Sequence, residues 1–365
     1  MTGAMYAAIS GMKAHMQKLN VIGNNIANIN TPAFKASQTT FKESIYTTIT
    51  SGSNGSSSAG GINPSQLGYG CNVGTIAMDM STASFSADGN NMHCMIDGSG
   101  FFLTGDKATA TTSDSKTTLN DVDPQDLDLS RVGDFTFDSQ GYLVDGQGHV
   151  IYGFVTYTAN TDGNTLKDTE KESPLVSTQL VPIRLPIAAG APTDKTKDPD
   201  AGTALYPTQD GTSGKNIYPT GSGNAITVSS IAIDKGTGKI TAVNDADNSN
   251  IVVGYLALGT VANPNGVTRL ENGYYQAGEG AGNCTATSIG GTVTGFLNKP
   301  ADATTGDAIL SSGKTALQTG GLESSGTDLA TEIAEMITTQ RGYQANTRII
   351  TVTDSMLEEM VNMKR

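Results

Sequence analysis

The sequence predicts a mostly β protein with a terminal α-helical coiled-coil stalk, built from several domains that are discontinuous along the chain. Two observations lead to this prediction. Both ends of the chain follow apolar heptad patterns, which are typical of packed helices. The residues between them are rich in Thr, Ser, Asn, Gly and Asp, with 44 glycines among 365 residues, and this mixture favours strands joined by many turns.

The first helix is expected over residues 3–29. Its apolar side chains recur at steps of three, four and seven residues, which places them along one helix face. Thr2 is a candidate N-cap, and Pro32 stops the helix because proline lacks an amide proton. We predict a packing role for the apolar stripe, which comprises Met5, Ile9, Met12, Met16, Leu19, Ile26 and Ile29.

A second, longer helix is expected over residues 327–363, with Thr327 and Asp328 as cap candidates. Its heptad register skips Gln340, Thr347 and Asp354, and a polar residue in a helical seam lowers stability but fixes register. Either stripe alone could be an ordinary core face. Helices at both ends most simply pack on each other, leaving apolar surface for neighbouring copies. The second stripe comprises Leu329, Ile333, Met336, Tyr343, Ile350 and Leu357.

The pattern divides the chain into four parts. Residues 1–32 and 327–365 form an inner helical stalk, and residues 33–70 form an extended linker whose stretch 51–61 has the Ser/Gly composition of a flexible segment. Residues 71–157 and 225–326 form a first β-domain, with residues 158–224 inserted in it as an outer β-domain.

Within the β-domains, strands are expected at 73–80, 101–103 and 225–258, and a series of hairpins at 131–157. The two prolines of residues 181–187 confine that strand to a sheet edge. Residues 259–325 are expected to be mostly turns and loops. The polar segment 104–130 is an excursion of open role.

Composition excludes several classes of partner. A net charge of −13 repels phosphate backbones, so nucleic acid is not expected to bind. No run of eighteen apolar residues exists, so membrane insertion is not expected either. The first residues lack the pattern of a cleavable secretory signal. The cysteines, Cys71, Cys94 and Cys284, have neither disulfide-framework nor zinc-site spacing.

The sequence contains no motif that indicates catalysis. His15, His93 and His149 lie outside any metal-binding spacing, and nucleotide-binding and hydrolase signatures are absent. The four aspartates at positions 121, 123, 126 and 128 form a cluster in the sequence, but this cluster lacks the glycine and the terminal glutamate of a calcium-binding loop. We therefore predict no catalytic, cofactor-binding or metal-binding residue, no cofactor, and no enzyme activity.

Two motifs resemble those of the bacterial flagellar rod and hook axial protein family. The first is GNNIANINTPAFK at 23–35, and the second is the segment 324–365, with TQRGYQAN at its centre. Asparagines near a helix end can bond backbone groups, and the proline then forces an extended path, so the first motif ends a helix and turns the chain. The motif residues are Asn24, Asn25, Asn28 and Pro32 in the first, and Gln340, Arg341, Gln344 and Asn346 in the second.

The resemblance implies a structural subunit that self-assembles into a helical tube of the flagellum. The insertion at 158–224 favours the hook, a curved universal joint that transmits torque from rod to filament, over the distal rod, which is the alternative. It also implies export through the flagellar type III apparatus, and contacts with the distal rod, hook cap and hook–filament junction proteins. The location is then the extracellular hook or the basal body. A secreted adhesin or enzyme on a coiled stalk is a competing class.

Overall fold

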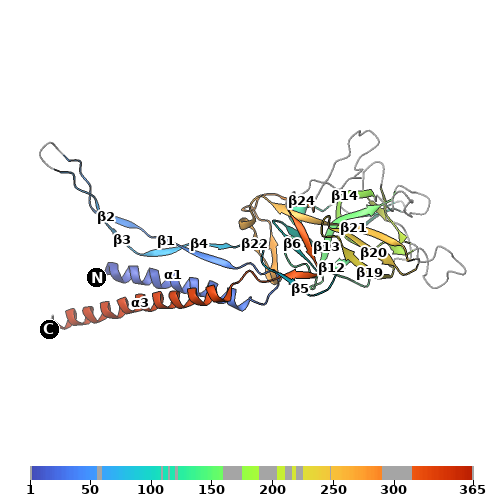
Figure 1. Ribbon diagram of the computed structural model, residues 1–365. Coiled ribbons are helices and arrows are strands. Elements are labelled where there is room, and N and C mark those ends of the chain that lie inside the picture. The colour runs from blue at the N-terminus through green and yellow to red at the C-terminus, as the bar shows by residue number, and fades with distance from the viewer. Residues whose placement is uncertain are drawn as a thin grey trace. The chain divides into compact units, whose positions relative to one another are not determined.

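The computed structural model describes residues 2–55, 60–107, 110–113, 116–119, 122–158, 175–188, 204–209, 216–218, 225–246, 248–289 and 315–363. The chain divides into two compact units, one formed by Met1–Asp79 with Ser325–Arg365 and the other by Met80–Ser324. The fold is mostly β with a helix in each terminal segment, as the sequence predicts (Figure 1). We call these the helical unit and the β-unit.

The helical unit contains helices α1 (Thr2–Ala27) and α3 (Leu329–Asn362), close to the predicted ranges. Thr2 is the first helical residue and not the N-cap that the sequence indicated. Asp328 does cap α3, because its carboxylate accepts hydrogen bonds from the Ala330 amide at 3.1 Å and the Thr331 hydroxyl at 2.6 Å.

The segment expected to be a linker is instead largely paired strand. Strand β1 (Ser37–Glu43) pairs antiparallel with β4 (Cys71–Met78), and β2 (Tyr46–Thr50) pairs with β3 (Ser65–Gly68) to form a hairpin. A further bridge joins Ser53 to Ile62. The described ends of the Ser/Gly stretch, 51–55 and 60–61, therefore continue this hairpin, and residues 56–59 lie outside the described part. Strand β4 was expected in the first β-domain, but its pairing with β1 places it in the helical unit.

The β-unit is built on a large antiparallel sheet with twelve strands among the described residues. Its main path runs β11–β12–β13–β21–β7–β10–β23–β22, with β14 on β13, β20 and β24 on β21, and β19 on β20. The strands are β7 (Phe101–Gly105), β10 (Asp128–Ser130), β11 (Thr136–Phe137), β12 (Leu143–Val144), β13 (Val150–Tyr157), β14 (Leu175–Pro182), β19 (Val228–Ile233), β20 (Lys239–Asn244), β21 (Asn250–Val261), β22 (Thr268–Arg269), β23 (Tyr274–Gln276) and β24 (Cys284–Ser288).

The core of the β-unit lies around strands β13 and β21. All eight residues of β13 are buried, and β21 is buried over most of its length. Such near-continuous apolar runs are typical of strands covered on both faces. Phe102 and Phe135 pack edge to face in this core, with ring centroids 4.9 Å apart.

Smaller sheets complete the β-unit. Strand β5 (Phe85–Ala87) pairs with β26 (Gly321–Glu323), and β6 (Cys94–Asp97) with β25 (Ala316–Thr319). The described part of residues 259–325 thus contributes five short strands, where the sequence indicated mostly turns and loops. These strands were missed because they are only two to five residues long, and because β23, β25 and β26 pair with strands far away in the chain. Short 3₁₀ turns lie at η1 (Pro124–Asp126), η2 (Pro264–Gly266) and η3 (Glu271–Gly273).

The described parts of the insertion at 158–224 lie in two places. Strand β14 and the short pair β15 (Ile187–Ala188) and β16 (Ala204–Leu205) supply residues to the core or the sheet edge of the β-unit. Strands β17 (Thr208–Gln209) and β18 (Asn216–Tyr218) instead form a small sheet with β8 (Ala110–Ser113) and β9 (Lys116–Leu119). The excursion at 104–130 thus pairs with part of the insertion. The single strand expected at 181–187 is not formed: residues 181–182 end β14, and Ile187 begins β15. Among the described residues, β14 pairs with β13 alone and so lies at an edge of the large sheet.

Candidate functional site

Helices α1 and α3 pack together as an antiparallel pair (Figure 1). Lys18 Nζ lies 2.9 Å from Glu335 Oε2, and Asn25 Nδ2 lies 2.8 Å from Glu332 Oε1. Lys18 contacts Glu335, whereas Asn25, which is closer to the end of α1, contacts Glu332, which is closer to the start of α3. Antiparallel packing follows from this order.

Two glycines let the helices approach closely. A Cβ atom on Gly11 would lie 2.8 Å from Asn346 Nδ2, and one on Gly342 would lie 2.8 Å from His15 Cε1. The His15 ring also packs edge-on against Phe41 of β1, with centroids 5.4 Å apart, so it has little room to move. Small residues are thus required at these two points of the seam.

Asn25 joins three segments of the helical unit. Its side chain is 1% exposed. The amide nitrogen donates to the Ser37 carbonyl at 2.9 Å and to Glu332, and the amide oxygen accepts from the Ser37 amide at 3.0 Å. One side chain therefore holds the end of α1, the start of β1 and the first turn of α3 together. This gives one asparagine of the first motif a specific structural role.

Burial and hydrogen bonds shift the pKa values of three side chains in or next to the seam. The pKa of His15 is lowered, first by burial and then by the nearby Lys18 ammonium. The pKa of Glu332 is raised by burial, although the hydrogen bond from Asn25 partly opposes that shift. The pKa of Asp328 is lowered by the hydrogen bonds it accepts from Thr331 and the Ala330 amide.

The seam has heptad spacing on both helices, but its register differs from the apolar stripes read from the sequence. On α1, contacts and burial show which residues face α3. Most of them come one position before a residue of the predicted apolar stripe. One position corresponds to a rotation of about 100° around the helix axis. On α3, four stripe residues coincide with the seam and the others do not. The seam comprises Ala8, Gly11, His15, Lys18, Ile22 and Asn25 of α1, and Glu332, Met336, Thr339, Tyr343, Asn346, Ile350, Thr353 and Leu357 of α3.

The stripe residues of the sequence analysis have mixed exposure. Met16 is 49% exposed, and Leu329 and Ile333 are also exposed. The other ten are half-buried, namely Met5, Ile9, Met12, Leu19, Ile26, Ile29, Met336, Tyr343, Ile350 and Leu357. Among the motif residues, Asn24, Pro32, Gln340, Arg341 and Gln344 are exposed, whereas Asn28 and Asn346 are half-buried.

Sequence reasoning missed the small and polar members of the seam. Ala8, Gly11, Thr339 and Thr353 are buried, yet a search for large apolar side chains passes over them. The hydroxyl of Thr339 donates to the Glu335 carbonyl of its own helix at 2.7 Å, so it can be buried without an unmet hydrogen bond. Small residues at steps of three and four were the available signal.

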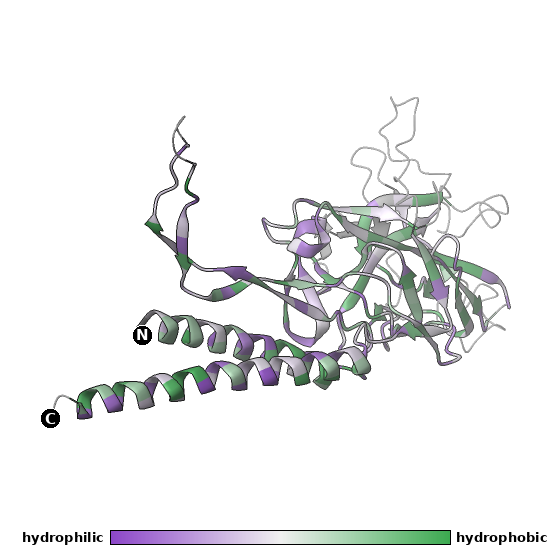
Figure 2. Ribbon diagram, turned by 60° about the vertical axis from the view of Figure 1, so that its left-hand side comes forward, coloured by the Kyte–Doolittle hydropathy of each residue, from purple (hydrophilic) through white to green (hydrophobic). Residues whose placement is uncertain are grey.

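Helix α3 carries apolar residues that neither α1 nor a strand covers. Apolar residues recur along the helix to its end (Figure 2). Successive residues are rotated by about 100° around the helix axis. The exposed apolar residues in the first half of α3 therefore lie on one side of the seam, and most of the exposed apolar residues in the second half lie on the other side. We call these the lower flank (Leu329, Ile333 and Ile337) and the upper flank (Ile349, Val352, Met356, Met360 and Met363).

The β2–β3 hairpin also exposes large apolar side chains. Ile45 is 75% exposed and Ile49 is 66% exposed. A two-stranded hairpin buries little of its own surface, so its stability depends on what packs against it. The exposed members of this hairpin are Ile45, Tyr46, Ile49, Ile62 and Leu67.

Two titratable side chains outside the helix pair, His93 and Asp123, have structural partners. Within the described ranges, no group of three or more His, Cys, Asp or Glu side chains could hold a metal ion. His93 is paired with Asp88, and Asp123 caps η1 by accepting from the Gln125 amide. Of the helices described, none combines the length and the apolar character that a membrane crossing requires.

Paired terminal helices with uncovered apolar flanks are typical of chains that pack against further chains. Two family matches fall on these helices. Residues 5–35 match the family described as flagella basal body rod protein, and residues 318–363 match the family described as flagellar basal body rod FlgEFG protein C-terminal.

Full-length relatives agree with these matches. The chain is 32% identical over 367 residues to the flagellar basal-body rod protein FlgG of Bacillus subtilis, covering all of both chains. It is 23% identical over 468 residues to the flagellar hook protein FlgE of Borreliella burgdorferi, again over all of both. It is 25% identical over 362 residues to FlgG of Buchnera aphidicola, covering 99% of each. The chain belongs to the flagellar hook and rod protein family.

Proposed function

We propose that this protein is a structural subunit of the flagellar hook that polymerises into a curved tube and transmits torque. One observation supports polymerisation most directly: the two apolar flanks of α3 are uncovered. Apolar side chains on an exposed helix gain about 1.5–3 kcal/mol each when a neighbour covers them fully. Copies of the same chain are the proposed neighbours, and the chain has no proposed catalytic role.

The arrangement of the flanks favours an open helical polymer over a closed dimer. The lower flank and the upper flank lie on different sides of the seam and in different halves of α3. When the upper flank of one copy packs on the lower flank of the next, two different surfaces are in contact. Such heterologous contacts repeat without closing when the rotation between copies does not return to its start.

The exposed hairpin supplies a second proposed contact between copies. Its exposed apolar residues lie on strands β2 and β3 or next to them, and a neighbouring copy would cover a segment that buries little surface of its own. We propose that the seam and stripe residues of α1 and α3 pack in the wall of the tube as a coiled coil. The small sheet of β8, β9, β17 and β18 is then proposed as the core of an outer domain.

A distal rod subunit is the second candidate, and the match to FlgG of Bacillus subtilis over both full chains favours it. The hook candidate is supported by the additional strands from the insertion at 158–224. The hook protein of Borreliella burgdorferi aligns over 468 residues and so carries segments that this chain of 365 residues lacks. The proposed partners follow from either candidate and are the neighbouring axial proteins, the hook cap, the junction proteins and the export apparatus.

Electron microscopy of a deletion strain separates the two candidates. If the protein forms the hook, cells lacking its gene retain rods and have no hooks, and polymers of the purified protein are curved. If the protein forms the distal rod, the deletion removes the rod end, and purified polymers are straight. Normal flagella in the deletion strain would contradict both.

A further inference from the structure

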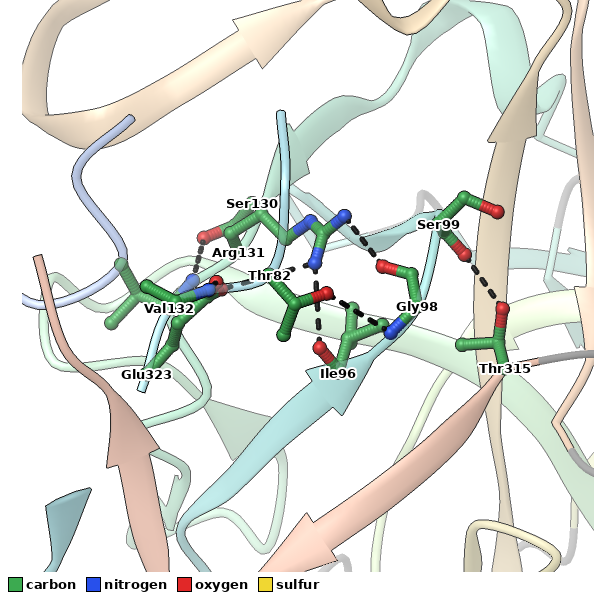
Figure 3. A network of polar contacts seen from close by, with 10 residues as sticks. Thr82, Ile96, Gly98, Ser99, Ser130, Arg131, Val132, Thr315 and Glu323 are labelled. Atoms are coloured by element: carbon green, nitrogen blue, oxygen red, sulfur yellow. Dashed lines mark hydrogen bonds and ion pairs between the residues drawn. The ribbon is translucent and has the colours of Figure 1, made fainter. Parts of the chain in front are cut away.

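The β-unit contains a buried ion pair close to both points where its chain joins the helical unit. Arg131 and Glu323 are each 2% exposed. Arg131 Nη1 lies 3.8 Å from Glu323 Oε2 (Figure 3). Burying two charges is costly unless further hydrogen bonds compensate, so the other contacts of the pair are important.

Arg131 connects the pair to the large sheet and to strand β6. It directly follows β10, which pairs with β7 and β23 in the large sheet. Its guanidinium donates to the Gly98 carbonyl at 2.8 Å and the Ile96 carbonyl at 3.4 Å, and lies 5.4 Å from the Phe101 ring centroid. This arginine is therefore fixed on three sides by residues of the β-unit core.

Glu323 connects the pair to both chain connections. It is the last residue of β26, just before the chain leaves the β-unit at Ser324. Its Oε1 accepts a hydrogen bond from the amide of Ala83, at 2.8 Å, on the segment where the chain enters the unit. The Ser324 amide also donates to the Ser84 carbonyl at 2.9 Å. One carboxylate thus joins the incoming and outgoing segments.

The strands at this point are short. The β5–β26 ladder pairs three residues with three and forms a sheet of its own, apart from the large sheet. A two-stranded sheet of that size is not stable alone. Thr82, on the incoming segment, accepts a hydrogen bond from the Gly98 amide at 3.3 Å, so both segments converge on the loop that Arg131 holds (Figure 3).

We propose that Arg131 and Glu323 form a clasp that fixes both chain connections to the large sheet, so that force entering along either connection reaches that sheet. This inference rests on the proposed function, because a subunit that transmits torque has to carry force through its chain connections. The chain joins the two units covalently only after Asp79 and after Ser324. Without the clasp, the same force would peel β26 from β5 one residue at a time.

The clasp can be tested by pulling the full chain with handles attached at residues 79 and 325. We expect the first rupture force to fall in Arg131→Met and in Glu323→Ala, and to fall less in Glu323→Gln, which keeps an acceptor for the Ala83 amide. The double variant Arg131→Met, Glu323→Ala should lose less than the two single effects added, because no charge is left buried alone. Lys107→Gln, which removes the exposed pair with Asp138, is the matched control and should not change the force.

Hydrogen exchange of the unloaded chain provides a second measurement. In Arg131→Met, exchange at Ala83 and in β5 and β26 should rise about ten- to a hundredfold, while β13 and β21 stay protected. Unchanged force and unchanged exchange in both single variants would overturn the clasp. A uniform rise that includes β13 and β21 would also overturn it, since the pair would then only add to global stability. Because both measurements use unpolymerised chain, they are independent of the tests for hook or rod.

Discussion

The amide nitrogen of Asn25 lies 2.8 Å from a carboxylate oxygen of Glu332, and this hydrogen bond joins residues 307 positions apart in the chain. It connects the end of α1 to the first turn of α3. Both residues are within the segments that match the flagellar family. The first motif therefore does more than end a helix, because it also holds the first turn of the second helix.

Replacing Asn25 by Ala should destabilise the helical unit by about 2–3 kcal/mol, because the change leaves the Ser37 backbone and the half-buried Glu332 without this partner. Thermal unfolding followed by the helical circular dichroism signal measures the loss. Asn24→Ala is the control, since Asn24 is exposed, and it should change the free energy of unfolding by less than about 0.5 kcal/mol. Equal effects of the two changes would contradict the role of Asn25.

Replacing Gly342 by Ala should weaken the helix pair even though alanine favours helix by about 1 kcal/mol. The new methyl group would lie 2.8 Å from the His15 ring, which Phe41 holds in place. Adding His15→Ala should restore stability by making room. Gly23→Ala has nothing within 4 Å of the new atom and should stabilise α1 by about 0.5–1 kcal/mol, so a gain at both glycines would disprove the close approach.

Acid should loosen the α1–α3 seam through His15. Its pKa in the fold is below the ordinary 6.5, because burial and Lys18 disfavour the charged ring. The unfolded chain therefore takes up the proton first, so this contribution is complete above pH 6.5 and decreases as the pH falls below that value. Melting temperatures measured between pH 7.5 and about 5.5 should fall more for the wild type than for His15→Gln. Glu332 titrates alike in both, and parallel curves would exclude His15 as the cause.

Charges on the upper flank of α3 should prevent polymerisation without unfolding the chain. Ile349 and Val352 are exposed, and aspartate at both positions would place two charges in the proposed contact between copies. Sedimentation should recover at least about tenfold less polymer than for the wild type, with an unchanged circular dichroism spectrum. Thr351→Asp, on the same exposed turn, is the control and should polymerise more readily. A second pair of helix changes, Ile9→Asp with Ile350→Asp, should also abolish assembly while the β-unit stays folded.

Only Cys71 should react quickly with a thiol reagent in the folded chain. Burial raises the pKa of Cys94 far above its ordinary value and that of Cys284 to about 11, so both remain protonated thiols. Cys71 is half-buried on β4. Alkylation followed by mass spectrometry should label one cysteine under native conditions and all three in denaturant. Native labelling of Cys94 would show that the core around β6 opens.

Several structural features could be predicted because they depend on neighbouring residues. Asp328 caps α3, and the chain turns away from helix before Pro32, because a cap and a proline act within a few residues. Strand β21 and the hairpins of β11–β13 follow from their local apolar patterns and turn residues. The family resemblance likewise depended on two short motifs near the ends of the chain.

Two features could not be predicted because they depend on residues far apart in the chain. They are the register of the α1–α3 seam and the contact between the segments where the chain enters and leaves the β-unit. Periodicity predicts that α1 has a helical face with heptad spacing, but not that Ala8 and Gly11 lie in the seam while Met16 is exposed. That choice depends on how closely α3 approaches, which is a property of both helices together. Glu323 lies 240 residues from Ala83, and nothing local to either indicates that they meet. The sequence by itself therefore determined the helices, their caps and many strands, whereas tertiary packing decided which faces meet and which are left for other chains.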